Sequence, residues 1–127
     1  MIAGAATRAS LAGDAPLVHM DDGRRRSGAE LHARVSALAR LLAARGLAGR
    51  RIGAWYQNSF AVLEAHLAIE WIGATRVPVD PAAPAAEAQQ VFDVAEVELV
   101  VADSTHAALL GGDVLIHDDD WPAGVRP

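Results

Sequence analysis

The chain has 127 residues, of which 52% are hydrophobic, 21% are charged and 5% are aromatic. That length fits one domain of ordinary size, and the apolar content is sufficient for a hydrophobic core, which excludes a disordered chain. The formal net charge of -5 excludes a broad electrostatic attraction to nucleic acid or to anionic lipid.

Two residue types are missing from the sequence. It contains no cysteine, which excludes disulfides and thiolate chemistry and is typical of a cytoplasmic protein. All 11 residues counted as lysine or arginine are arginine. Any chemistry that needs a lysine, such as a Schiff base or a phosphate-binding loop, must therefore be supplied by another segment or another chain.

The first residues are small and weakly patterned. Arg8 and Asp14 interrupt this stretch, so it has no apolar core of a signal peptide and no membrane span. We expect residues 1–13 to form a flexible lead-in and residues 14–127 to form one α/β subdomain.

A small β-hairpin is predicted next. Residues 17–20 and 24–27 flank the turn Asp21-Asp22-Gly23, and an Asp-Gly pair favours a tight turn. The only basic run, Arg24 to Arg26, falls within this hairpin, and we expect it to be a solvated turn or strand end because binding phosphate needs a wider basic surface.

A helix follows the hairpin. Ser27 and Glu30 have the spacing of a capping box, and Gly46 is placed to end the helix. Its expected buried positions are Leu31, Val35, Leu38, Leu41 and Leu42. Its expected solvent-facing positions are Arg34, Arg40 and Arg45.

A second helix is predicted over residues 60–72, after a strand over residues 52–57. Asn58 or Ser59 can cap the helix, and Gly73 closes it. The helix is apolar nearly all round, interrupted by Glu64, His66 and Glu70. We expect it to be buried on more than one side.

Three prolines then mark an element boundary, because proline fixes φ and removes a backbone donor. Pro78 and Pro81 close a short strand over residues 76–79, and Pro84 can lie in the first turn of a third helix. That third helix carries Val91, Phe92 and Val94. The remaining elements are a strand over 98–103, a short helix over 105–110 and a strand over 113–118. This alternation predicts an α/β fold of three layers, with a mostly parallel sheet and crossover helices after the hairpin.

Seven short segments along the chain have a distinctive order and spacing. They are DAPLV at 14–18, SGAEL at 27–31, LAARG at 42–46, QNS at 57–59, IGA at 72–74, VPVDPAAPAAE at 77–87 and ELVVAD at 98–103. In this order they resemble the beginning of the adenylate-forming, or AMP-binding, superfamily, of the acyl-CoA synthetase and adenylation-domain type. The resemblance covers residues 14 to 104. Gly28, Gln57 and the pair Trp55-Tyr56 depart from the family pattern, which leaves the subfamily and the substrate open.

The resemblance implies the N-terminal subdomain of a larger AMP-binding domain. The whole enzyme would use ATP and Mg²⁺ to convert a carboxylic or fatty acid to an acyl-adenylate, and would then transfer the acyl group to coenzyme A or to a carrier thiol. The ATP-binding loop and the catalytic lysines of the family have no counterpart in this sequence. The chain is therefore expected to be scaffold, inactive alone, with no catalytic, cofactor-binding or metal-binding residue, and its partner is expected to be the remainder of the enzyme.

Other candidate sites have structural interpretations that we favour. The run His117-Asp118-Asp119-Asp120 lacks metal-ligand spacing and is expected to be a solvated loop. The histidines are expected to be structural or solvent-exposed; the others are His19, His32, His66 and His106. Trp55, Tyr56 and Trp71 could line a pocket, but core packing is favoured.

Two other classes of protein remain as alternatives. The first is a stand-alone binding module that forms a homodimer through the apolar helix 60–72 or complements a separate chain. The second is a small doubly wound nucleotide-binding or receiver domain. The sequence disfavours the second, because it contains neither Gly-x-Gly-x-x-Gly after a strand nor any lysine.

Overall fold

The structure is a computed structural model that describes residues 16–19 and 25–119, so the expected lead-in over 1–13 lies outside the described residues. The elements follow one another in the order predicted from the sequence. They are β1 (Pro16–His19), β2 (Arg25–Ser27), α2 (Gly28–Ala44), β3 (Arg51–Trp55), α3 (Phe60–Trp71), β4 (Thr75–Pro78), α4 (Ala85–Ala95), β5 (Leu99–Ala102), α5 (Ser104–Ala107) and β6 (Val114–Ile116).

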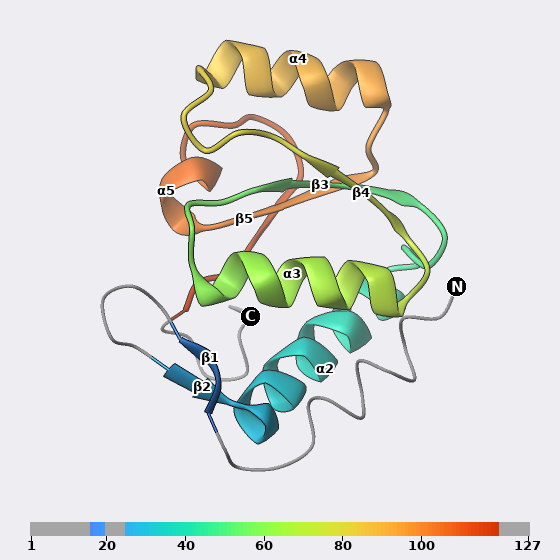
Figure 1. Cartoon of the computed structure of the whole chain (residues 1–127). Helices are drawn as coiled ribbons and strands as arrows, with labels where there is room; N and C mark the ends of the chain where they lie inside the picture. The colour runs from blue at the N-terminus through green and yellow to red at the C-terminus, as the bar shows by residue number, and fades with distance from the viewer. Residues whose placement is uncertain (1–15, 20–24, 120–127) are drawn as a thin grey trace.

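Four of the strands form a parallel sheet in the order β4-β3-β5-β6. The strands β1 and β2 form a separate antiparallel hairpin. Helices α4 and α5 cover one face of the sheet, and α3 covers the other, with α2 packed beside α3 (Figure 1). The predicted α/β fold, with its three layers and its preceding hairpin, is confirmed.

Helix α2 begins and ends as its local sequence predicts. The amide of Glu30 donates to Ser27 Oγ at 3.1 Å, and the amide of Ser27 donates to Glu30 Oε1 at 3.0 Å, which completes the capping box. Gly46 follows the helix with a φ of 77°, a left-handed conformation that side chains disfavour. The amide of Leu47 then donates to Leu42 O at 3.1 Å and stops the helix.

The core has two parts, one on each face of the sheet. The larger part joins α2 and α3 to the sheet through Val35, Leu38, Leu42, Ile52, Ala65, Ile69, Leu99 and Val101, among others. The smaller part lies under α4 and consists of Trp55, Ala88, Phe92, Val100 and Ala102. The predicted core positions of Trp55 and Tyr56 are confirmed, since the two side chains are only 0% and 2% exposed.

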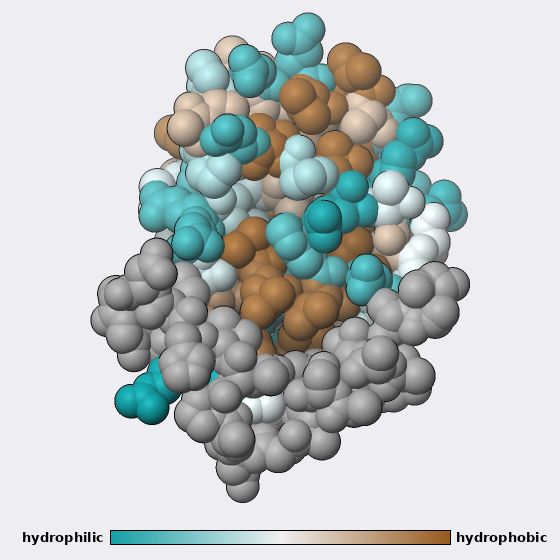
Figure 2. Space-filling model, in the orientation of Figure 1, coloured by the Kyte–Doolittle hydropathy of each residue, from teal (hydrophilic) through white to brown (hydrophobic). Residues whose placement is uncertain are grey.

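Helix α3 is less completely covered than its composition predicts. Its inner face is buried, but Val62, Leu67, Trp71 and Ile72 are only partly buried against the core. Apolar residues gather over this helix on the face shown in Figure 2. The inner side of α3 is therefore packed against the core, and its outer side is partly exposed.

The proline segment differs from the prediction in one detail. Pro84 is the N-cap residue of α4, with a ψ of 147°, and does not lie in the first turn. Pro84 itself is extended and not helical, so α4 begins at Ala85. Of the three apolar residues predicted on this helix only Phe92 is buried, while Val91 and Val94 are exposed.

Candidate functional site

The candidate site is the edge of the sheet where β3, β5 and β6 end. In open α/β sheets ligands bind outside the carboxyl ends of the strands, so this edge is where a site is expected. Three aspartates from the loops at this edge are Asp103, Asp118 and Asp119. Each accepts hydrogen bonds from the backbone of a neighbouring loop or helix.

Asp103 follows β5 and joins two elements. Its Oδ2 accepts from the amide of Gln57, at the end of β3, at 2.8 Å. Its Oδ1 accepts from the amide of His106 at 2.8 Å and so caps α5. The carboxylate lies between the two loops where a doubly wound domain would hold a nucleotide phosphate, which disfavours the nucleotide-binding form of that alternative.

Asp118 and Asp119 follow β6 and extend this pattern. Asp118 Oδ1 accepts from the amide of Ser104 at 2.9 Å, which connects the loop after β6 to α5. Asp119 Oδ1 accepts from the amide of Ala61 at 2.6 Å, at the start of α3. The hydroxyl of Ser59 caps the same helix by accepting from the amide of Val62 at 3.2 Å. The loops after β3, β5 and β6 are therefore tied to one another through carboxylates.

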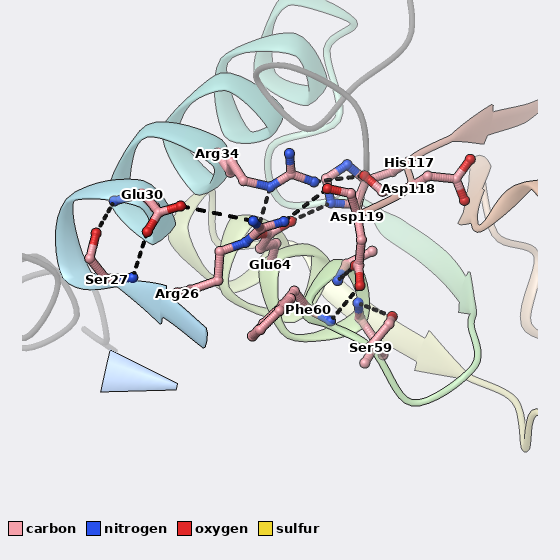
Figure 3. A network of polar contacts seen from close by, with 12 residues as sticks. Arg26, Ser27, Glu30, Arg34, Ser59, Phe60, Glu64, His117, Asp118 and Asp119 are labelled. Atoms are coloured by element: carbon pink, nitrogen blue, oxygen red, sulfur yellow. Dashed lines mark hydrogen bonds and ion pairs between the residues drawn. The ribbon is translucent and has the colours of Figure 1, made fainter. Parts of the chain in front are cut away.

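Beneath this edge lies a buried charged network centred on Glu64, which is 0% exposed (Figure 3). Arg34 Nε donates to Glu64 Oε2 at 2.7 Å. His117 Nε2 donates to Glu64 Oε1 at 3.1 Å. Arg26 Nε lies 3.6 Å from Glu64 Oε2, and its guanidinium lies 4.6 Å from the centre of the Phe60 ring. Glu64 thus joins the hairpin, α2 and the segment after β6 to α3.

This network overturns three predictions of solvent exposure. Arg34 is buried rather than solvent-facing, because Glu64 lies opposite it across the contact between α2 and α3. Arg26 has a side chain only 17% exposed, whereas Arg25 is exposed as predicted and Arg24 lies outside the described residues. His117 is 0% exposed and is not part of a solvated loop.

The sequence carried a signal that could have located this network. Arg34 adjoins the apolar stripe that contains Leu31, Val35 and Leu38, so part of its side chain faces the core. Glu64 is the acidic residue in the middle of an apolar helix. A buried cation on one helix and a buried carboxylate on the next predict an ion pair, since neither charge is stable alone in a core.

A second cluster holds the proline segment against the sheet. Trp55 Nε1 donates to Asp80 O at 2.9 Å, and His106 Nε2 lies 3.0 Å from Pro81 O. The ring centroids of Trp55 and His106 are 4.5 Å apart, and His106 Nδ1 lies 2.8 Å from Asp103 Oδ1. His106 is therefore structural, as expected, and both of its ring nitrogens are engaged.

Tyr56 is buried beside His117, with the two ring centroids 6.2 Å apart. Burial raises the pKa of Tyr56 well above its usual value, and the negative charges of Asp103, Glu64 and Asp118 raise it further. The hydroxyl consequently stays protonated at physiological pH. Tyr56 is not suited to act as a base or as a nucleophile.

A hollow of about 250 Å³ lies beside α3, next to the ends of β3 and β4. It is lined mainly by apolar side chains, including Val62, Pro78 and Val79, together with the ring of His66. Burial and the nearby charge of Arg76 lower the pKa of His66 to about 4. The hollow is therefore uncharged near neutral pH and does not include the Glu64 network.

The polar groups at the start of α3 and the buried arginines have partners within the protein. The N-terminus of α3 is occupied by Ser59 and Asp119, and the buried guanidinium groups of Arg26 and Arg34 are paired with protein oxygens. Within residues 16–19 and 25–119, no group of three His, Cys, Asp or Glu side chains could hold a metal ion. Asp120, the last residue of the acidic run, lies outside the described residues.

Comparison with known proteins identifies the family of this chain. The sequence matches the family described as AMP-binding enzyme over residues 5–123. The chain belongs to this family. It therefore shares the ancestry of adenylate-forming ligases, and the resemblance seen in its motifs is confirmed.

Most of this chain is similar to a part of each of several known proteins. An L-proline--[L-prolyl-carrier protein] ligase of Streptomyces coelicolor is 37% identical over 97 residues, which are 76% of this chain and 17% of that protein. The structure of apo MatB from Rhodopseudomonas palustris has a TM-score of 0.70 and 29% identity, covering 91% of this chain and 25% of that one. The N-terminal subdomain of Klebsiella oxytoca NpsA has a TM-score of 0.69 and 26% identity, covering 81% of this chain and 27% of that one.

The chain thus spans about a quarter or less of the relatives it matches. Its fold is that of the N-terminal subdomain of adenylate-forming enzymes. None of the helices in the described ranges combines the length and the apolar composition needed to cross a membrane.

Proposed function

We propose that this chain is a scaffold portion of an ATP-dependent ligase that activates a carboxylic acid as an acyl-adenylate and passes the acyl group to a thiol. The observation that carries this proposal is the match to the AMP-binding enzyme family along residues 5–123. The architecture supports it, because the carboxylates of Asp103, Asp118 and Asp119 accept hydrogen bonds from the protein backbone at the carboxyl edge of the sheet. On this proposal, ATP, Mg²⁺ and the acyl acceptor are bound by the remainder of the enzyme.

A carrier-protein thiol is the acceptor that we favour over coenzyme A. The Streptomyces coelicolor relative is named as a ligase of L-proline and a carrier protein. A further similar structure, with a TM-score of 0.70 and 26% identity, is an artificial fusion of an adenylation domain with a carrier domain. These relatives make L-proline the first acid to test.

The test is a transplant into the Streptomyces coelicolor ligase, in which the aligned segment is replaced by this chain. We expect the chimera to catalyse L-proline-dependent exchange of pyrophosphate into ATP within about ten-fold of the parent, a difference of about 1.4 kcal/mol in the barrier. The ligase without this segment is the negative control, and the 127-residue chain alone is expected to show no exchange with any acid. Exchange by the isolated chain, or a folded chimera without activity, would overturn the scaffold function.

A second candidate function is a stand-alone module that dimerises through helix 60–72. The observation that favours it is the partly buried apolar surface of α3. Sedimentation equilibrium tests it, with Leu67→Glu as the variant that should dissociate a dimer. A monomer at all concentrations would exclude this function.

A further inference from the structure

The segment after β6 is held by two arginines whose side chains converge on consecutive carbonyls. Arg34 Nη2 donates to Asp118 O at 2.7 Å, and Arg26 Nη2 donates to Asp119 O at 2.8 Å. Glu64 faces the Nε atoms of both arginines, at 2.7 Å and 3.6 Å. We propose that Glu64 is a positioning residue, which aims these two guanidinium groups and thereby fixes the path of the chain as it leaves β6.

The geometry of the guanidinium group explains why one carboxylate can do this. The group is planar, and its donors form a rigid fork, so an interaction at Nε determines the direction in which Nη2 points. Glu64 is 0% exposed, so water does not compete for its oxygens, and the ionic hydrogen bond from Arg34 is strong. Arg26 lies further from the carboxylate, so its interaction with Glu64 is the weaker of the two.

The consequence extends beyond the two carbonyls. With the backbone of residues 118 and 119 held, their side chains reach the amides of Ser104 and Ala61. Glu64 thus acts at a distance on the connections of α5 and α3 to the loop after β6.

Hydrogen exchange of single amides, measured by NMR on the full 127-residue chain, tests this role. In Glu64→Gln we expect the amides of Ala61 and Ser104 to exchange about ten-fold faster or more, because each loses a positioned carboxylate acceptor. The amides of Ala74 and Thr75, bonded at the opposite edge of the sheet, serve as references and should not change. Glu98→Gln, which removes an exposed partner of Arg50, is the matched control and should leave Ala61 unaffected.

A second variant keeps the test decisive if Glu64→Gln does not fold. Arg26→Gln releases Asp119 but leaves Arg34 on Asp118, so the amide of Ala61 should exchange faster while that of Ser104 stays protected. Equal acceleration at these amides and at the references would indicate a general loss of stability and overturn the positioning role. Unchanged exchange at Ala61 in the folded variants would also overturn it. Neither result depends on pyrophosphate exchange, so failure of the proposed function is detected separately.

Discussion

Arg34 and Glu64 form a buried ion pair between α2 and α3, in which Arg34 Nε lies 2.7 Å from Glu64 Oε2 and the two side chains are 9% and 0% exposed. A buried charge without its partner is costly, whereas a buried pair contributes little more than an apolar pair of similar volume. Removal of one partner alone is therefore expected to be severe.

Arg34→Met should lower the free energy of unfolding by about 3–5 kcal/mol, because Glu64 is left buried without this partner. Adding Glu64→Leu should recover part of the loss, so the double variant is more stable than the sum of the single effects predicts. Urea unfolding measures both. The control is Arg50→Gln, whose partner Glu98 is exposed, with an expected change of about 1 kcal/mol or less. Equal losses at Arg34 and Arg50 would contradict the prediction.

Gly53→Ala should destabilise the sheet by overpacking. A Cβ at Gly53 would lie 2.6 Å from Phe92 Cε1 and 3.1 Å from Val100 Cγ2, so the ring must move. We expect a loss of about 1–3 kcal/mol in thermal or urea unfolding. Combining it with Phe92→Leu should relieve the clash and give a favourable coupling energy. Gly111→Ala is the control, because no atom lies within 4 Å of the added carbon; a similar loss there would argue against overpacking.

Asp103→Asn should loosen the carboxyl edge of the sheet. One carboxylate oxygen accepts from Gln57 and the other from His106, so an amide nitrogen at either position faces a donor. The expected loss of stability is about 1.5–3 kcal/mol, the range for hydrogen bonds to a charged group. Asp113→Asn, at an exposed position before β6, should be neutral in the same urea titration. A neutral Asp103→Asn would refute the role assigned to this carboxylate.

His66 should make the stability of the fold depend on pH. Its pKa is lowered from 6.5 to about 4 in the folded chain, by burial first and by Arg76 second. Between these values the unfolded chain binds a proton that the folded chain does not, so the free energy of unfolding falls as the pH falls from about 6.5 to about 4. His66→Gln should flatten this slope in unfolding measured across that range. If His66→Gln keeps the slope of the parent chain, His66 is not its source.

Much of the fold was predictable from short stretches of sequence. The capping box of Ser27 and Glu30, the glycine after α2 and the hydroxyl of Ser59 before α3 all act within a few residues of where they occur. The alternation of strands and helices then led to a parallel sheet. Each of these features is local, which is why the sequence predicted the elements to within a few residues.

The candidate site was much less predictable. Arg34 was expected in solvent and His117 in a solvated loop, yet both contact Glu64, at sequence separations of 30 and 53 residues. Periodicity places a side chain on a helix face but does not identify what lies opposite that face. The partner that stabilises a buried charge is identified only by the packing of the helices.

The sequence by itself determined the elements and their order, because caps, turns and hydrophobic periodicity are properties of neighbouring residues. The resemblance to the family came from the order and spacing of its short motifs. The tertiary structure alone decided which charges are buried and how the carboxyl edge of the sheet is closed. Both depend on bringing together the hairpin, α2, α3 and the segment after β6. A buried carboxylate such as Glu64 is stable only where that packing places a partner such as Arg34 within hydrogen-bonding distance.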